Sequence, residues 1–365
     1  MSVRAFPRTA EPRHAEPRHV EHRHTFACFG GQCTVIVADA ARPADAAAAA
    51  AMAKRALLAW HQRFSRFEPD SELSRLNRDP AATVAVTPLM GRVIETAVQA
   101  ARDTGGLVDA TLAHEIERAG YGSHFDGEGT DLRSALALAP SRAPAARHPD
   151  ERWRQVSVDC RAGIVHRPPG LRIDVGGIAK GVFADQLASL FDGFDAYVLD
   201  CAGDLRVGGR AGLVRPVHVA GAFGSERLHT FALTGGAVAT SGISRRSWIG
   251  DDGRPAHHLL DPRTGQPAFT GIVQASALAP TAAEAEILAK AAILGGPARA
   301  AGWLRHGGVI VLDDGRYVPL EPPAPVAAAA SVAPGVSTRA PSQPTMSAST
   351  VSRSGSLRIS WKRPS

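Results

Sequence analysis

Two short segments combine residue types that could do phosphate chemistry. DVGGIAKG (174–181) joins a predicted strand to a predicted helix, so it offers free backbone N–H groups and the Lys180 ammonium to an anion. Its spacing fits neither the P-loop nor the dinucleotide-binding pattern, and a tight glycine turn also explains it. HHLLDPRTG (257–265) gathers a histidine, a carboxylate and a cation, and His258 could be a general base at neutral pH. An Asp-Pro turn whose carboxylate bonds its own backbone is the alternative there.

A third segment, AEAEILAKA (283–291), reads as an amphipathic helix in which Glu286 and Lys290 stand four residues apart. On a solvated helix face such a pair contributes only about 0.3–0.5 kcal/mol. Lysine is rare in this chain, with four lysines against 37 arginines, so Lys290 could mark a position that favours a compact ammonium over a planar guanidinium. The spacing alone leaves open whether this is a surface ion pair or part of a site.

The charge of the chain lies in its ends. The chain has 365 residues, is 44% hydrophobic and 21% charged, and carries a formal net charge of +6. Residues 1–25 contribute +2 and residues 322–365 contribute +5, which leaves −1 for the residues between them. A near-neutral body argues against nucleic-acid binding. Both ends are low in complexity and rich in Pro, so we expect disordered tails over 1–25 and 322–365 and one large catalytic body over 26–321.

The cysteines and the hydropathy pattern indicate a reduced compartment. The four cysteines show no C-x-x-C pair and no Cys/His metal spacing, so we expect free, mostly buried thiols. No run of 18 apolar residues suggests a membrane span, and no apolar segment before residue 25 resembles a signal peptide. These observations predict a cytoplasmic protein.

The body mixes helices and strands without a regular alternation. We expect strands near 33–39 and 271–279, and helices near 43–64, 87–106 and 178–192. Residues 124–151 read as an irregular excursion, and 243–267 as rich in loops. The pattern predicts an α+β fold in which mixed or antiparallel sheets pack with helices.

The order of the motifs is more specific than any one of them. The series comprises FGGQC (29–33), FSRFEPDSELSRLN (64–77), GGLVDATL (105–112), DVGGIAKG (174–181), CAGDLRVGG (201–209), ATSG (239–242), HHLLDPRTGQP (257–267) and PTAAEAEILAKAAILGG (280–296). Over about 26–315 the chain resembles the FAD:protein FMN transferases, the ApbE-like flavin transferases. This resemblance implies that FAD and magnesium are bound. It also implies that the FMN moiety is transferred to a Ser or Thr hydroxyl of an acceptor protein, with release of AMP.

The resemblance also assigns roles to individual residues. It implies that His258 deprotonates the acceptor hydroxyl, with Asp261 or its neighbours orienting the ring. Eight positions would contact FAD: Phe29, Phe67, Leu107, Val108, Asp109, Asp174, Lys180 and Leu260. Three positions would form the metal site: the Gly177 carbonyl, Glu286 and Lys290. From the residues alone, an N-cap is the plain explanation of Asp109.

The metal site departs from the family pattern. The family places Asp and Thr, one helical turn apart, where this chain has Glu286 and Lys290. Glu keeps an oxygen ligand, whereas a protonated Lys cannot ligate a cation. Either magnesium is held by Glu286, backbone carbonyls and substrate phosphates, or the Lys290 ammonium takes over part of the metal's role. We favour retained magnesium at this point.

Other classes of function remain. A damaged metal site would leave an FAD-binding protein without transfer activity, or an FAD pyrophosphatase that yields FMN and AMP. A scaffold or nucleic-acid protein that acts through its basic C-terminal tail is a further alternative. SAST (347–350) resembles the family's acceptor sequence, Ser/Thr-Gly-Ala-Thr, which raises self-flavinylation.

Overall fold

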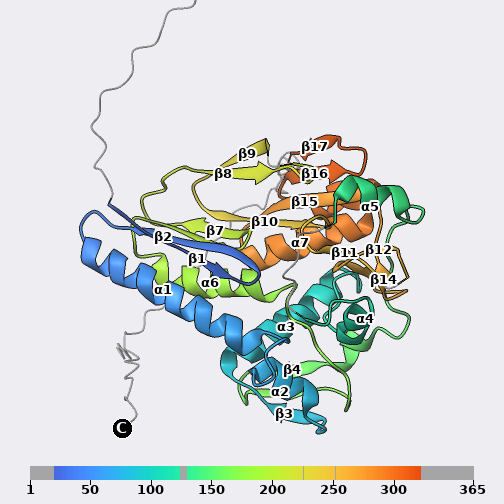
Figure 1. The fold of residues 1–365 in the computed structure, drawn as a ribbon. Helices are drawn as coiled ribbons and strands as arrows, with labels where there is room; N and C mark the ends of the chain where they lie inside the picture. The colour runs from blue at the N-terminus through green and yellow to red at the C-terminus, as the bar shows by residue number, and fades with distance from the viewer. Residues whose placement is uncertain (1–19, 124–129, 225, 251, 322–365) are drawn as a thin grey trace, which may run out of the picture. The chain divides into compact units, whose positions relative to one another are not determined.

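The computed structural model describes residues 20–123, 130–224, 226–250 and 252–321. They form a body around an eight-stranded sheet in which all neighbouring strands are antiparallel (Figure 1). Its strands, in spatial order, are β1 (Glu21–Cys28), β2 (Gly31–Ala38), β6 (Ala196–Cys201), β7 (Asp204–Gly208), β10 (Gly236–Gly242), β15 (Ile272–Ala279), β16 (Gly308–Leu312) and β17 (Tyr317–Leu320). The predicted α+β class is confirmed.

Three helices cover one face of this sheet (Figure 1): α1 (Pro43–Phe64), α6 (Ala179–Phe191) and α7 (Ala282–Gly295). In α1 the buried residues Ala46, Ala50, Ala53 and Leu57 recur at intervals of four, three and four, which places them on one stripe. Helix α7 is buried almost all round, because α6 and the following helix α8 (Pro297–Trp303) also pack against it. Any charged side chain on α7 therefore needs a partner inside the protein.

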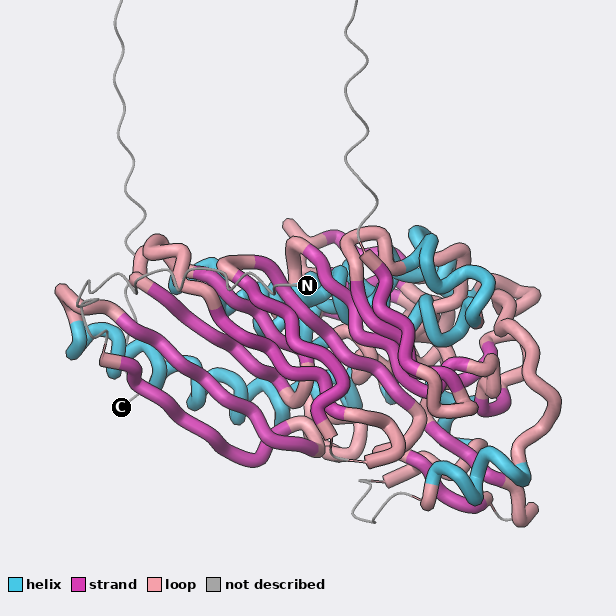
Figure 2. Tube along the Cα trace, turned by 90° about the horizontal axis from the view of Figure 1, so that it is seen from above, coloured by secondary structure: helices cyan, strands magenta, loops and turns pink. Residues whose placement is uncertain are grey.

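The other face carries the hairpin of β8 (Arg215–Ala220) and β9 (Arg227–Leu233). Its inward residues Val217, Val219 and Phe231 pack on Val238 of β10 and Val309 of β16. Figure 2 shows the strands of the main sheet side by side, with helices on its far side. Helices thus cover one face of the sheet, and the hairpin covers part of the other, over β10 and β16.

A second group of elements lies beyond the helical face. It contains helices α2 (Glu72–Arg78), α3 (Pro88–Asp103) and α4 (Ala113–Arg118), the 3-10 turn η1 (Arg152–Gln155) and the small sheet of β3 (Thr83–Ala85), β5 (Ile164–His166) and β4 (Ser157–Asp159). Short pieces complete the described chain: α5 (Leu132–Leu138), β11 (Ser247–Ile249), β12 (Pro255–His257), β13 (Leu260–Asp261) and β14 (Gln266–Pro267). The loops between the two groups carry most of the candidate site residues.

Some of the predicted boundaries are wrong. Strand β1 begins at Glu21, so residues 21–25 belong to the body and not to an N-terminal tail. Helix α5 interrupts the excursion at 124–151, and short strand pairs occupy part of 243–267. The predicted tail over 322–365, SAST included, and most of the one over 1–25 lie outside the described residues.

The cysteine prediction is confirmed. Cys28, Cys33 and Cys201 are buried free thiols, and Cys160 is an exposed free thiol. Within the described ranges, no helix combines the length and the apolar character needed to cross a membrane.

Candidate functional site

Four charged side chains meet where α6, α7 and β7 come together: Lys180, Asp204, Glu286 and Lys290, called here the lysine–carboxylate cluster. Lys180 is hydrogen-bonded to Asp204, and its Nζ lies 3.6 Å from Glu286 Oε1. The Nζ of Lys290 donates to the same Oε1 at 3.1 Å. Glu286 is 0% and Asp204 1% exposed, so these are interior ion pairs. The Glu286–Lys290 spacing therefore marks a buried site and not a solvated helix face.

A glycine makes this meeting possible. A Cβ on Gly181 would lie 2.6 Å from backbone atoms of Ala283, so α6 and α7 touch backbone to backbone there. The close approach lets the Gly181 N–H donate to Glu286 Oε2 at 2.9 Å. Asp185 of α6 accepts the N–H groups of Ala282 and Ala283 at 2.8 and 2.9 Å, which satisfies free donors at the start of α7. The two helices are thus locked in register.

The ionisable groups of the cluster differ in the direction in which their pKa values are shifted. Burial and repulsion from Glu286 raise the pKa of Asp204 to about 7, although Lys180 opposes the rise. Burial alone would raise the pKa of Glu286, but Lys290 and Lys180 outweigh it and lower that pKa to about 2. For Lys180 the attraction of Asp204 and Glu286 outweighs burial and raises its pKa. Glu286 is therefore the permanent anion, and both lysines face it.

Lys290 also reaches the glycine turn of the DVGGIAKG segment. A Cβ on Gly177 would lie 3.1 Å from Lys290 Cε, so the lysine stem lies directly against this glycine. The side chain of Lys290 is only 11% exposed. The stem of Lys290 thus packs on Gly177 while its ammonium bonds Glu286, and these are the two positions that the resemblance assigns to magnesium along with Lys290 itself.

The donor set of the cluster does not fit a divalent cation. An ion bound to Glu286 Oε1 at the usual Mg–O distance of about 2.1 Å would lie within about 6 Å of both lysine ammoniums. At an effective dielectric of 20, each lysine would then repel it by about 5–7 kcal/mol. Both Glu286 oxygens already accept hydrogen bonds, from Lys290 and from the Gly181 N–H, and Asp204 Oδ1 is the cluster's carboxylate oxygen that is buried without a partner. Among the residues that the structure describes, no group of three or more His, Cys, Asp or Glu side chains is placed to hold a metal.

His258 faces this cluster from the loop after β12. Burial, Arg246, His257 and Lys290 hold its pKa well below the ordinary histidine value. Its Nδ1 is buried and has no hydrogen-bond partner. A neutral imidazole with an unused nitrogen can accept a proton.

Arg246 ties His258 to the turn between β1 and β2. Its Nη2 donates to the Phe29 carbonyl at 2.9 Å. Phe29 has φ 55°, in the left-handed region that non-glycine residues rarely occupy, and this bond helps to hold it there. The Phe29 ring contacts the rings of His61 and Phe183, with centroids 5.3 and 5.7 Å away.

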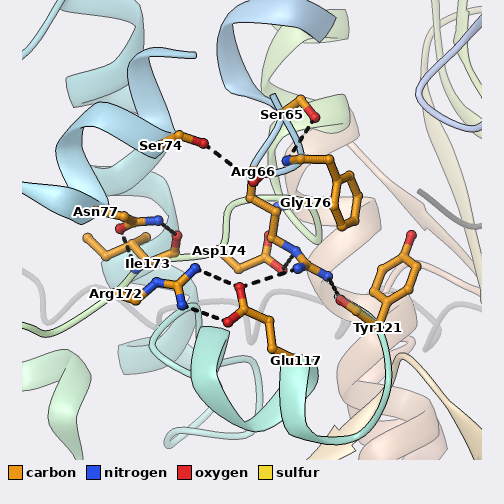
Figure 3. Close-up of polar contacts among 11 residues, drawn as sticks. Ser65, Arg66, Ser74, Asn77, Glu117, Tyr121, Arg172, Ile173, Asp174 and Gly176 are labelled. Atoms are coloured by element: carbon orange, nitrogen blue, oxygen red, sulfur yellow. Dashed lines mark hydrogen bonds and ion pairs between the residues drawn. The ribbon is translucent and has the colours of Figure 1, made fainter. Parts of the chain in front are cut away.

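A second set of charges surrounds Arg66: Glu117, Arg172 and Asp174, which together with Arg66 are called the Arg66 cluster (Figure 3). Arg66 Nε lies 3.0 Å from Asp174 Oδ2, and its Nη1 lies 3.7 Å from Glu117 Oε1. Arg172 holds Glu117 through two bonds of 2.6 Å. The other Asp174 oxygen accepts the Gly176 N–H at 2.8 Å, so Asp174 braces the turn that leads to Gly177.

Aromatic rings line the same place. The guanidinium of Arg66 lies over the rings of Phe67 and Tyr121, 4.2 and 4.9 Å from their centroids. Tyr121 meets Phe67 edge-on at 5.4 Å and stacks on Trp248 at 5.7 Å with an interplanar angle of 19°. Flat rings beside a fixed guanidinium suit a planar aromatic ligand.

The loop at 107–111 adjoins this region. The Ala110 carbonyl accepts the Asp174 N–H at 2.8 Å. Leu107 and Val108 are buried in the core, and their N–H groups donate to the Thr104 carbonyl and hydroxyl at 3.3 and 3.0 Å. Asp109 does not cap a helix, because its Oδ1 accepts from the Thr111 N–H and hydroxyl at 2.8 and 2.7 Å. Its Oδ2 is buried without a partner, and burial raises its pKa.

The turn after His258 is built by Asp261. Its Oδ1 accepts the N–H groups of Ala146 and Arg263 at 2.9 and 3.1 Å, so this carboxylate holds the turn and is not bonded to His258. Leu260 is buried and lies opposite Pro267 in the short β13–β14 pair. The Asp-Pro turn interpretation is therefore right for Asp261.

The structure thus gathers the predicted residues in two neighbouring sets. Phe29, Gly177, Lys180, His258, Glu286 and Lys290 belong to the lysine–carboxylate side, and Phe67 and Asp174 to the Arg66 side. Leu107, Val108 and Asp109 lie on the loop before Ala110, whose carbonyl accepts the Asp174 N–H, and Leu107 packs with Ala145, Ala268 and Leu294. Leu260 lies on the turn after His258. Their roles stay predictions. Sequence reasoning missed Arg66, Tyr121, Asp204 and Arg246, although Arg66 and Asp204 stand inside quoted motifs as isolated charges beside apolar residues.

Comparison with known sequences agrees with this geometry. The sequence model of the ApbE family matches residues 29–312. The FAD:protein FMN transferase of Klebsiella pneumoniae is 27% identical over 256 residues, which cover 68% of this chain and 71% of that protein. The FAD:protein FMN transferase of Treponema pallidum is 28% identical over 260 residues, covering 65% and 68%.

Solved structures share the fold. The ApbE protein of Thermotoga maritima aligns with a TM-score of 0.66 at 24% identity, covering 83% of this chain and 97% of that one. The flavinyl transferase ApbE of Pseudomonas stutzeri aligns with a TM-score of 0.65 at 21% identity, covering 84% and 95%. Because the family match spans well over half of the sequence, this chain belongs to the ApbE family.

Proposed function

We propose that this protein transfers the FMN moiety of FAD to a Ser or Thr hydroxyl of an acceptor protein and releases AMP. The observation that carries the proposal is the placement of His258, a neutral base, beside Lys290 and Arg246 within a member of the ApbE family. A weak hydroxyl nucleophile needs such a base, and a diphosphate needs nearby cations.

In this reaction the hydroxyl oxygen attacks the phosphorus of the FMN half of the diphosphate. His258 takes the hydroxyl proton, a new P–O bond forms, and the P–O bond to the AMP phosphate breaks. AMP leaves with the electron pair of that bond. The negative charge of bound FAD would also offset the positive field of Arg246 and Lys290, which raises the proton affinity of His258 when a base is needed.

The second set of residues suits the flavin half of FAD. Phe67 and Tyr121 offer ring faces and edges, and the Arg66 guanidinium fixes both rings. Asp174 stands beside them and is bonded to the Ala110 carbonyl, on the loop that carries Leu107 and Val108. FAD would thus extend from the aromatic rings to the lysine–carboxylate cluster.

Flavin transfer can be tested directly. The full chain is mixed with FAD and an acceptor domain that carries Ser/Thr-Gly-Ala-Thr, and flavin fluorescence is sought on the acceptor after denaturing electrophoresis. We expect labelled acceptor and one AMP per flavin with the wild type, and at least a hundredfold slower labelling with His258→Ala. His166→Ala, on the exposed edge of β5, is the matched control and should label at the wild-type rate. Accumulation of free FMN and AMP without labelled acceptor would replace the proposal with FAD hydrolysis.

A further inference from the structure

The position of the Lys290 ammonium leads to an inference about the metal requirement of the proposed reaction, and this inference rests on the proposed function. Its Nζ donates to Glu286 and its stem lies on Gly177. Glu286 and Gly177 are the two positions where the family resemblance expects a metal to be held. We infer that the Lys290 ammonium permanently takes the metal's place in this protein and that FMN transfer here requires no divalent cation.

The coordination chemistry of Glu286 supports this substitution. Its Oε1 accepts from Lys290 and is approached by Lys180, and its Oε2 accepts the Gly181 N–H. The negative charge of this buried carboxylate is therefore already balanced by hydrogen-bond donors and by the lysine ammoniums. A cation arriving there would have to displace the Lys290 ammonium from its buried acceptor, Glu286.

The groups around Lys290 form a fixed set. The negative groups are Glu286 and Asp204, and the positive or ionisable ones are Lys180, Arg246 and His258. Two lysines and an arginine therefore surround the place where the diphosphate would lie. The ammonium and guanidinium groups can offset the charge on the departing AMP phosphate, which is the task that a metal would otherwise perform.

Glu286 also explains why this chain differs from the family pattern at two positions of α7, 286 and 290. Together with Lys290 at the next turn of α7, the glutamate forms an i, i+4 pair whose members meet at 3.1 Å. The substitution of Thr by Lys thus comes with its own counter-ion. Glu286 and Lys290 thus act together, and the ammonium of Lys290 replaces a bound metal ion.

The test compares the wild type with three variants of the full chain. Lys290→Thr restores the residue type expected of the family, Lys290→Met removes the charge without adding a ligand, and Lys54→Thr is the control at a helical lysine of α1 outside the site. Each is stripped with a chelator, and flavin transfer is measured in excess chelator and with added magnesium. Mn²⁺ binding is followed separately by the loss of the free-ion signal in electron paramagnetic resonance, with and without FAD and against an FAD-only blank.

We expect wild type and Lys54→Thr to transfer flavin at rates that differ less than twofold between chelator and magnesium, and to leave the Mn²⁺ signal at the blank level. Lys290→Thr should lose at least a hundredfold in chelator, recover with magnesium and bind Mn²⁺. Lys290→Met should lose as much and recover nothing.

Two results would overturn the inference: loss of wild-type transfer in chelator with recovery by magnesium, or stoichiometric Mn²⁺ binding by the wild type. The Mn²⁺ titration judges the site even if no acceptor is labelled. Failure of labelling in both chelator and magnesium would instead count against the proposed function.

Discussion

The lysine–carboxylate cluster and the Arg66 cluster each combine two cations with two carboxylates, but they differ in their surroundings. The first stands on α6, β7 and α7, and its carboxylates are excluded from water. The second stands on loops and on the short helix α4, and Glu117 and Arg172 keep 30% and 29% of their side chains exposed. Arg66 itself is 5% exposed, but water can replace a lost partner of Glu117 or Arg172, and it cannot do so for Glu286 or Asp204. The two should therefore respond very differently to the same kind of substitution.

The largest effect is expected for Glu286→Ala. It leaves two buried ammoniums without their shared anion, so we expect the free energy of unfolding to fall by about 3–5 kcal/mol. The measurement is urea unfolding followed by circular dichroism. Glu284→Ala, half a turn away on α7 and paired with the exposed Arg305, is the control and should cost less than about 1 kcal/mol. Equal losses for the two variants would remove the distinction between the clusters.

Lowering the pH should reduce the free energy of unfolding, because a buried histidine is neutral in the folded protein. Burial lowers the pKa of His257 to about 3, and this residue is 1% exposed. Below about pH 6.5 the unfolded chain binds a proton at this histidine while the folded chain does not, so stability falls as pH falls. The loss approaches about 1.4 kcal/mol per pH unit, which gives about 2 kcal/mol between pH 6.5 and 4.5, and it stops near pH 3.

The slope of unfolding free energy against pH measures this effect. In His257→Asn the slope should become shallower by about 1.4 kcal/mol per unit over the same window, whatever the absolute stability of the variant. The Arg66 cluster contains no histidine, so substitutions there should leave the slope as it is. An unchanged slope in His257→Asn would show that this ring is protonated in the folded protein.

An intermediate effect is expected for Arg66→Leu on FAD binding. The guanidinium that lies over Phe67 and Tyr121 is lost, so we expect the Kd for FAD to rise about tenfold, or about 1.4 kcal/mol. Quenching of flavin fluorescence gives the Kd. Arg172→Leu touches Glu117 but neither ring, and should change the Kd less than threefold. A similar loss in both variants would assign the effect to charge and not to the stacked rings.

The smallest effect is expected for Glu117→Gln. The amide can still accept from Arg172, and water reaches both side chains, so the loss of stability should stay at or below about 1 kcal/mol. Thermal unfolding at two salt concentrations measures it, and the difference from wild type should shrink at the higher one. A loss as large as that of Glu286→Ala would mean that the Arg66 cluster is as dry as the other.

The sequence predicted what depends on local pattern. The helices expected near 43–64 and 178–192 depend on neighbouring residues, and they are confirmed as α1 and α6. The tail boundary at 25 failed because β1 is polar and alternates on an exposed edge, where a His- and Arg-rich strand looks like a linker.

The candidate site shows the same difference between features that depend on neighbouring residues and features that depend on long-range contacts. The series of motifs named residues on both sides, but pairings across long sequence distances had no local signal. Asp204 meets Lys180 and Arg246 meets Phe29 only because α6, β7 and the β1–β2 turn converge. The burial of the Glu286–Lys290 pair could not be read from its spacing either, since a surface pair has the same spacing.

The backbone contact at Gly181 has a consequence for how substrate enters and leaves. With no side chain between them, and with Asp185 holding the first N–H groups of α7, α6 and α7 have no room to slide or part. We expect the motions of each turnover to fall on the loops that carry Phe67, Tyr121 and His258. Hydrogen–deuterium exchange should then show the slowest amides along α6 and α7 and faster exchange, slowed by FAD, in those loops. The packed helices α6 and α7 would then form the rigid wall of the site, and the loops would form its mobile wall.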